Sequence, residues 1–130
     1  MLTLPTSDFV RHYIQNTAPI MRADLLKVIE IMREVAPEAE LVGDLGIPYF
    51  KKNASWLFGV AAREGNLCVF FADLGALHSF SKRLRHTKFG DNCLIIHSLD
   101  DVNINVFVEL IGQMKVHFDL SNREGKTLIQ

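Results

Sequence analysis

Five carboxylate side chains lie between positions 30 and 44 of this sequence, and carboxylates can act as ligands of a metal ion. Oxygen donors of this kind are the ligands that hard cations such as iron or magnesium prefer. The stretch lacks the regular alternation of a calcium loop and has no histidine at ligand spacing. An iron-binding surface and a solvated helix end with its loop therefore both stay open. The five candidate ligands are Glu30, Glu34, Glu38, Glu40 and Asp44.

Basic side chains gather in a second stretch, between positions 82 and 88. Cations, the Thr87 hydroxyl and a glycine that lets the backbone approach closely could together bind a phosphate or another anion. The Gly-x-x-x-x-Gly-Lys-Ser/Thr order of a P-loop is absent. Charge at the end of a solvated helix remains the alternative. The residues that best fit a site for an anion are Lys88 and Gly90.

Large aromatic side chains stand in the middle of the chain. Tyr49 belongs to the run Gly-Ile-Pro-Tyr-Phe at 46–50, and Trp56 opens the next apolar run. Since aromatic walls with a few polar groups are typical of ligand pockets, we expect Tyr49, Trp56, Lys88 and Gly90 to line a pocket for a small anionic ligand or a partner segment.

No arrangement typical of catalysis is present, so the sequence predicts no catalytic residue. The histidines at 12, 78, 86, 97 and 117 show neither His-x-x-x-His nor His-Glu-x-x-His spacing, and there is no Gly-x-Ser-x-Gly motif. Cys68 and Cys93 lie in apolar runs, where buried thiols are expected. Enzymatic activity stays open, and the absence of these motifs favours a protein that is not an enzyme.

The elements that must position these residues follow from hydrophobic spacing. Apolar residues at helical spacing predict helices over 8–16, 19–36 and 74–84 and a last helix from about 103. Branched and aromatic runs predict strands at 46–50, 55–62, 67–72 and 93–97, with the first at a sheet edge because of Pro48. The resulting order is α-α-β-β-β-α-β-α. We expect an α+β fold with an antiparallel sheet of about four strands, one domain over 1–118 and a C-terminal tail over 119–130.

Length and composition indicate one ordinary globular domain. The chain has 130 residues, of which 48% are hydrophobic and 22% charged, and its net charge is −1. This charge does not favour nucleic acid or an anionic membrane, and no apolar run is long enough to span a bilayer. With no apolar core near the N-terminus for a signal peptide, we expect a cytoplasmic protein. A homodimer is left open.

Three sequence blocks carry a resemblance to a known family. They are Ala-Pro-Glu-Ala-Glu at 36–40, Gly-Ile-Pro-Tyr-Phe at 46–50 and Lys-Phe-Gly-Asp-Asn-Cys-Leu at 88–94. In this order they resemble the YdhG-like family of uncharacterised bacterial domains, over about residues 8–115. The resemblance implies an α+β fold with helices covering an antiparallel sheet, and it places Lys88 and Gly90 in a loop at one edge of the sheet, near the aromatic strand residues. It brings no agreed activity, although some members have been proposed as frataxin-like iron chaperones.

Two functions follow as hypotheses. The first is a non-enzymatic binding module that takes a small anionic ligand or a protein partner and needs no certain cofactor. The second is an intracellular iron chaperone that uses the carboxylates named above.

Overall fold

The computed structural model describes residues 8–72, 80, 83–84, 87–90 and 93–129, and it describes the side chains of the last helix up to residue 120. Two helices stand at the start of this part of the chain. Helix α1 spans Asp8–Asn16 and α2 spans Pro19–Val35. Pro19 stands at the start of α2, where its missing N–H costs no hydrogen bond. The guanidinium of Arg22 donates to the carbonyls of Gln15 and Thr17, which close the end of α1. The sequence prediction for both helices is confirmed.

A six-stranded antiparallel sheet follows, in the order β1-β2-β3-β4-β6-β5. The prediction of about four strands was wrong, because β1 and β5 have only three and two residues and so show no alternation. The expected edge position of the strand after Pro48 was also wrong: β1 lies outside it, which makes β2 an interior strand. The strands are β1 (Glu40–Val42), β2 (Tyr49–Lys52), β3 (Ser55–Arg63), β4 (Asn66–Phe71), β5 (Lys88–Phe89) and β6 (Cys93–Ile96).

Two tight turns join β2 to β3 and β3 to β4. Both central residues of each turn have positive φ: Asn53 and Ala54 in the first turn, Glu64 and Gly65 in the second. Two-residue hairpin turns of this kind match the twist of the flanking strands. Asn66, which follows the second turn, is paired with Arg63 in the ladder.

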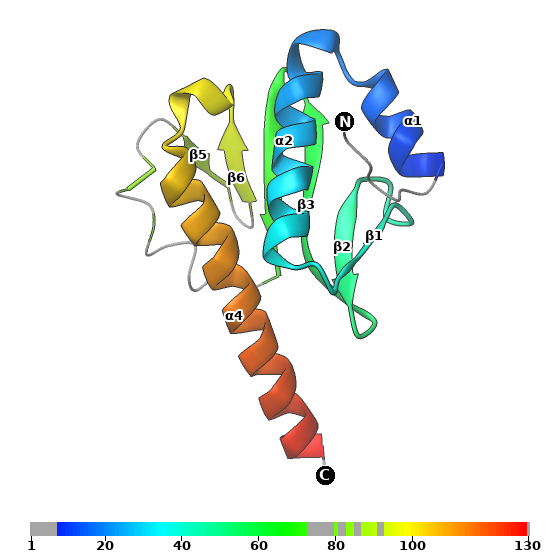
Figure 1. Cartoon of the computed structure of the whole chain (residues 1–130), viewed down its shortest axis with the longest axis vertical. Coiled ribbons are helices and arrows are strands. Elements are labelled where there is room, and N and C mark those ends of the chain that lie inside the picture. The colour runs from blue at the N-terminus through cyan, green and yellow to red at the C-terminus, as the bar shows by residue number, and fades with distance from the viewer. Residues whose placement is uncertain (1–7, 73–79, 81–82, 85–86, 91–92, 130) are drawn as a thin grey trace.

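Helices α2 and α4 cover one face of the sheet (Figure 1). On that face Phe50 pairs with Phe58, and Phe58 with Phe71, so three fully buried rings lie side by side across the strands. The α4 helix (Ile104–Ile129) contributes a buried stripe, and the Asn103 side chain caps its start by accepting from the amides of Asn105 and Val106. The buried residues of α4 are Phe107, Leu110, Ile111, Met114 and Phe118.

The C-terminal part of the chain differs from the expected tail. Helix α4 continues through positions 119–129, and Figure 1 shows its end extending beyond the sheet. The preceding connection contains a short 3-10 helix, η1 (Leu99–Asp101), whose Leu99 amide donates to Asp24 of α2.

The helix predicted over 74–84 lies mostly outside the described residues. Phe80 and Leu84 are described and are buried in the core, while Arg83 donates two hydrogen bonds to Glu109 of α4. Among the helices of the described ranges, none is both long enough and apolar enough to cross a membrane.

Candidate functional site

The aromatic and basic residues predicted to share a pocket lie on different parts of the sheet. Tyr49 is in β2 and Trp56 in β3, whereas Lys88 is in the edge strand β5 and Gly90 follows it. Strands β4 and β6 stand between β3 and β5, a lateral separation of about 14 Å at the usual strand spacing. The edge position implied by the family resemblance agrees with the structure, but the proximity to the aromatic strand residues does not.

Tyr49 has a different partner. Its hydroxyl donates a hydrogen bond to the carboxylate of Asp44, which was a candidate metal ligand. This bond lowers the pKa of Asp44 and raises the pKa of Tyr49. Two residues assigned to separate sites therefore contact one another, and the Tyr49 ring itself is buried.

The remaining carboxylates do not gather around a common point. Glu38 accepts from Lys52 at 2.9 Å and pairs with Lys115 at 2.9 Å, and these bonds lower its pKa to about 2. Glu30 and Glu34 are on α2, and Glu40 is in β1 opposite Lys51. Over the described ranges, no group of three or more histidine, cysteine, aspartate or glutamate side chains could hold a metal ion.

A pocket lies elsewhere, where β3 runs past the end of β2. The last bond between these strands joins the Val60 amide to the Pro48 carbonyl. The next amide on that side, Ala62 N–H, donates instead to the hydroxyl of Tyr13 at 3.0 Å. This bond ties α1 to the edge of β3, and the space between them remains open.

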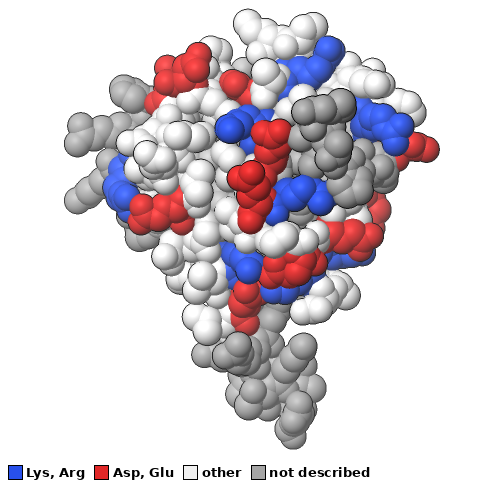
Figure 2. Space-filling view, in the orientation of Figure 1, with Lys and Arg blue, Asp and Glu red and all other residues white. Residues whose placement is uncertain are grey.

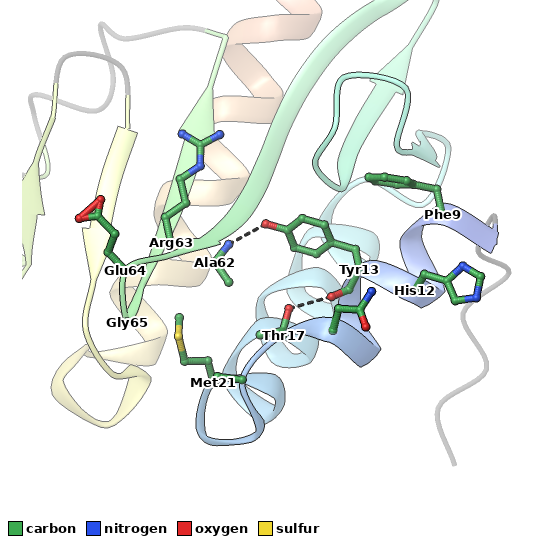
Figure 3. Close-up of a pocket in the computed structure, with 11 residues that line it drawn as sticks. Phe9, His12, Tyr13, Thr17, Met21, Ala62, Arg63, Glu64 and Gly65 are labelled. Carbon is green, nitrogen blue, oxygen red and sulfur yellow. Dashed lines mark hydrogen bonds between the residues drawn. The ribbon is translucent and has the colours of Figure 1, made fainter.

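The pocket has a volume of about 390 Å³, within the range of small-molecule sites. The aromatic rings of Phe9 and Tyr13 and the buried Met21 form much of its apolar wall, and the turn after β3 forms its rim (Figure 3). Thr17, which is buried, donates to the Tyr13 carbonyl at 2.8 Å and fixes the floor. The lining residues are Phe9, His12, Tyr13, Asn16, Thr17, Ala18, Met21, Ala62, Arg63, Glu64 and Gly65.

The start of α2 gives this pocket an electrostatic preference. Ala18 is the N-cap residue of α2 and offers no capping side chain, and the first turn of the helix has no acidic residue. The partial positive charge of the helix N-terminus is therefore not offset locally. Because Ala18 and Met21 line the pocket, the dipole of α2 favours a negatively charged group there, whereas the Glu64 carboxylate at the rim opposes it.

The charged side chains of the rim contribute less. The Arg63 guanidinium lies 5.5 Å from the centre of the Phe70 ring, so this cation is already engaged with another strand. His12, Asn16 and Glu64 are exposed. The arrangement can therefore bind a small molecule by its apolar surface and one polar end.

Sequence reasoning missed this pocket. Its two walls lie about fifty positions apart in the chain, and neither carries a motif. One signal was present: Tyr13 stands on the apolar face of α1, and a tyrosine hydroxyl on a packed face needs a partner.

Comparisons of the chain with protein-family models, with curated proteins and with solved structures found no match. The resemblance to the YdhG-like family stays a prediction from the sequence blocks that carry it.

Proposed function

We propose that this protein is a non-enzymatic binding domain whose pocket between α1 and the β3–β4 turn takes a small organic anion with an apolar body. The observation that carries the proposal is the pocket of about 390 Å³. Its volume suits one small molecule better than a polymer or a peptide segment.

The chemistry of the ligand follows from the two ends of the pocket. Phe9, Tyr13 and Met21 offer apolar and aromatic contact to a ring or a short aliphatic chain. The uncapped N-terminus of α2 beside Ala18 favours a carboxylate or a similar anion at the other end. A small carboxylic acid with an aromatic or aliphatic body satisfies both.

This proposal keeps the anionic ligand expected from the sequence and moves it away from Lys88. The iron hypothesis has no comparable support, since Glu38 is engaged by Lys52 and Lys115 and Asp44 by Tyr49. Membership of the YdhG-like family would fit either function.

The test is isothermal titration of the full chain with benzoate, phenylacetate and hexanoate, and with benzyl alcohol as an uncharged probe. We expect saturable binding of at least one carboxylate and weaker binding of the alcohol. Ala18→Phe should abolish binding, because the new ring enters the pocket from the exposed N-cap position.

Ile20→Phe is the matched control. Ile20 lies in the same helical turn, is 89% exposed and does not line the pocket. Equal binding by the two variants would show that the carboxylates bind elsewhere. If none of the three carboxylates binds the unaltered protein at millimolar concentrations, the proposal is wrong for small carboxylic acids.

A further inference from the structure

One wall of the pocket is a length of strand edge that pairs with no other strand. Pairing between β2 and β3 stops at Pro48, whose carbonyl accepts from the Val60 amide at 3.0 Å. Because proline has no N–H, Pro48 cannot donate to Val60 in return, and the ladder ends here. Strand β3 continues to Arg63 beyond this point. The edge of β3 at Ala62 therefore faces the pocket.

Both backbone polar groups of Ala62 point to this edge. In an antiparallel strand the N–H and C=O of one residue lie on the same side, and the sides alternate along the strand. The amides of Val60 and Ala62 both point to the β2 side, since they donate to Pro48 and to the Tyr13 hydroxyl. Figure 3 shows the bond between Ala62 and Tyr13 at the edge of β3. The Ala62 carbonyl therefore points to the same side as its amide.

This carbonyl is an acceptor that the fold leaves for a ligand. Of the hydrogen bonds that the described residues make with one another, none has the Ala62 carbonyl as its acceptor. The neighbouring amide is already bonded to Tyr13, so the edge of β3 offers an acceptor at this point and no donor. A ligand group that contacts this edge has to be a hydrogen-bond donor.

The carbonyl also discriminates between ligands of the same shape. A ligand that fills the pocket takes the carbonyl out of contact with water, and a buried carbonyl without a donor costs free energy. Over the face of the molecule drawn in Figure 2, acidic and basic side chains are interspersed. Since no single sign of charge dominates that face, short-range bonds inside the pocket have to select among organic anions.

We propose that the ligand of the pocket is a small acid whose body carries an amide N–H, as in an acylated amino acid. This inference rests on the proposed function, from which it takes the apolar contact and the anionic group beside Ala18. The amide N–H donates to the Ala62 carbonyl, as the N–H of a neighbouring strand would. A charged ammonium group is a poorer donor here, because the dipole of α2 opposes a cation.

Titration calorimetry of the full chain with a matched pair of probes tests this proposal. Hippurate joins a benzoyl group to acetate through an amide N–H, and O-benzoylglycolate has an ester oxygen in place of that N–H. The two probes share the ring, the carboxylate and the overall shape. Hippurate should bind about tenfold more tightly, because the ester has no donor and turns oxygen lone pairs toward the carbonyl.

Carbonyl carbon shifts show where the bond forms. The Ala62 carbonyl can be observed through the Arg63 amide in a triple-resonance spectrum of the labelled protein. Hippurate should move this resonance downfield, as expected when a carbonyl accepts a hydrogen bond, and O-benzoylglycolate should not. The Ala61 carbonyl is the control, since Ala61 points to β4 and pairs with Cys68 in the ladder. Its resonance should respond equally to both probes.

The outcomes separate this inference from the proposed function. If phenylacetate and hippurate bind and O-benzoylglycolate binds as tightly as hippurate, the pocket takes organic acids but the N–H has no role, and this inference alone is wrong. A preference for hippurate without a shift of the Ala62 carbonyl also overturns it, because the donor then bonds elsewhere. If none of these probes binds at millimolar concentrations, the proposed function and this inference are both wrong.

Discussion

At the residue scale, the Tyr13 hydroxyl does two things. It accepts the hydrogen bond from Ala62 N–H, which the ladder between β2 and β3 leaves without a strand partner, and it positions α1 as one wall of the pocket. An amide at this partly buried place has no other acceptor among the bonds seen in the described chain. Tyr13 therefore links the stability of the sheet edge to the shape of the site.

Tyr13→Phe should lower the free energy of unfolding by about 1 kcal/mol, because it leaves the Ala62 N–H without its acceptor. Urea denaturation measures the change. Tyr49→Phe is the comparison: the Asp44 carboxylate that loses its donor is exposed and can be hydrated, so the loss should be smaller. Equal losses would show that the hydroxyl of Tyr13 has no special structural role.

Substitutions of Ala54 and Gly65, in the two hairpin turns, should change the stability of the protein in opposite directions. Ala54 has a φ of 67°, a region that disfavours side chains, so Ala54→Gly should stabilise the protein by about 0.5–1 kcal/mol. Gly65 has a φ of 80°, and a Cβ added there would meet no heavy atom within 4 Å, so Gly65→Ala should destabilise the protein by about 1–2 kcal/mol through backbone strain alone. Thermal unfolding of both variants checks the two signs together.

At the element scale, a network of charges joins β2, the segment after α2, and α4. Lys52 pairs with Glu38 at 2.9 Å and with Asp119 of α4 at 2.7 Å, and Lys115, one turn before Asp119, also pairs with Glu38. Hydrogen bonds from Lys52 and Lys115 lower the pKa of Glu38 to about 2, against an ordinary value of 4.5. These ion pairs therefore add polar contacts to the apolar packing that holds α4 on the sheet.

This network predicts a loss of stability in acid. Since the folded-state pKa of Glu38 is lowered, its contribution is fully present above about pH 4.5 and is lost as the pH falls toward 2. Because the Glu38 side chain is 41% exposed, the contribution is at most about 1 kcal/mol. Urea unfolding at pH 7 and pH 3 should show a larger difference for the unaltered protein than for Glu38→Gln. A difference of the same size in both proteins would assign the acid sensitivity to other groups.

The sequence predicted the elements that have a strong period and missed those that depend on tertiary pairing. Helices α1 and α2 and the start of α4 follow from apolar spacing and capping residues such as Asn103. Strands β1 and β5 are too short to carry a pattern and form only because β2 and β6 offer them free edges.

At the scale of the whole molecule, the order of the strands decides which candidate residues can meet. Lys88 and Trp56 are apart because β4 and β6 lie between their strands, and the hydrophobic pattern along the chain does not specify that order. The pocket also depends on contacts between distant parts of the chain. Strand β3 extends beyond the end of β2, and α1 lies beside that extension. The α+β class was predictable from the sequence, but the position of the site was not.

The most direct test of the proposed site is amide chemical-shift mapping of the isotopically labelled protein during titration with phenylacetate. The proposal predicts saturable shifts in two groups of amides, residues 9–21 and residues 62–65, which line or adjoin the pocket. Shifts confined to the region of Lys88 and Gly90, or no shifts at millimolar phenylacetate, would contradict it.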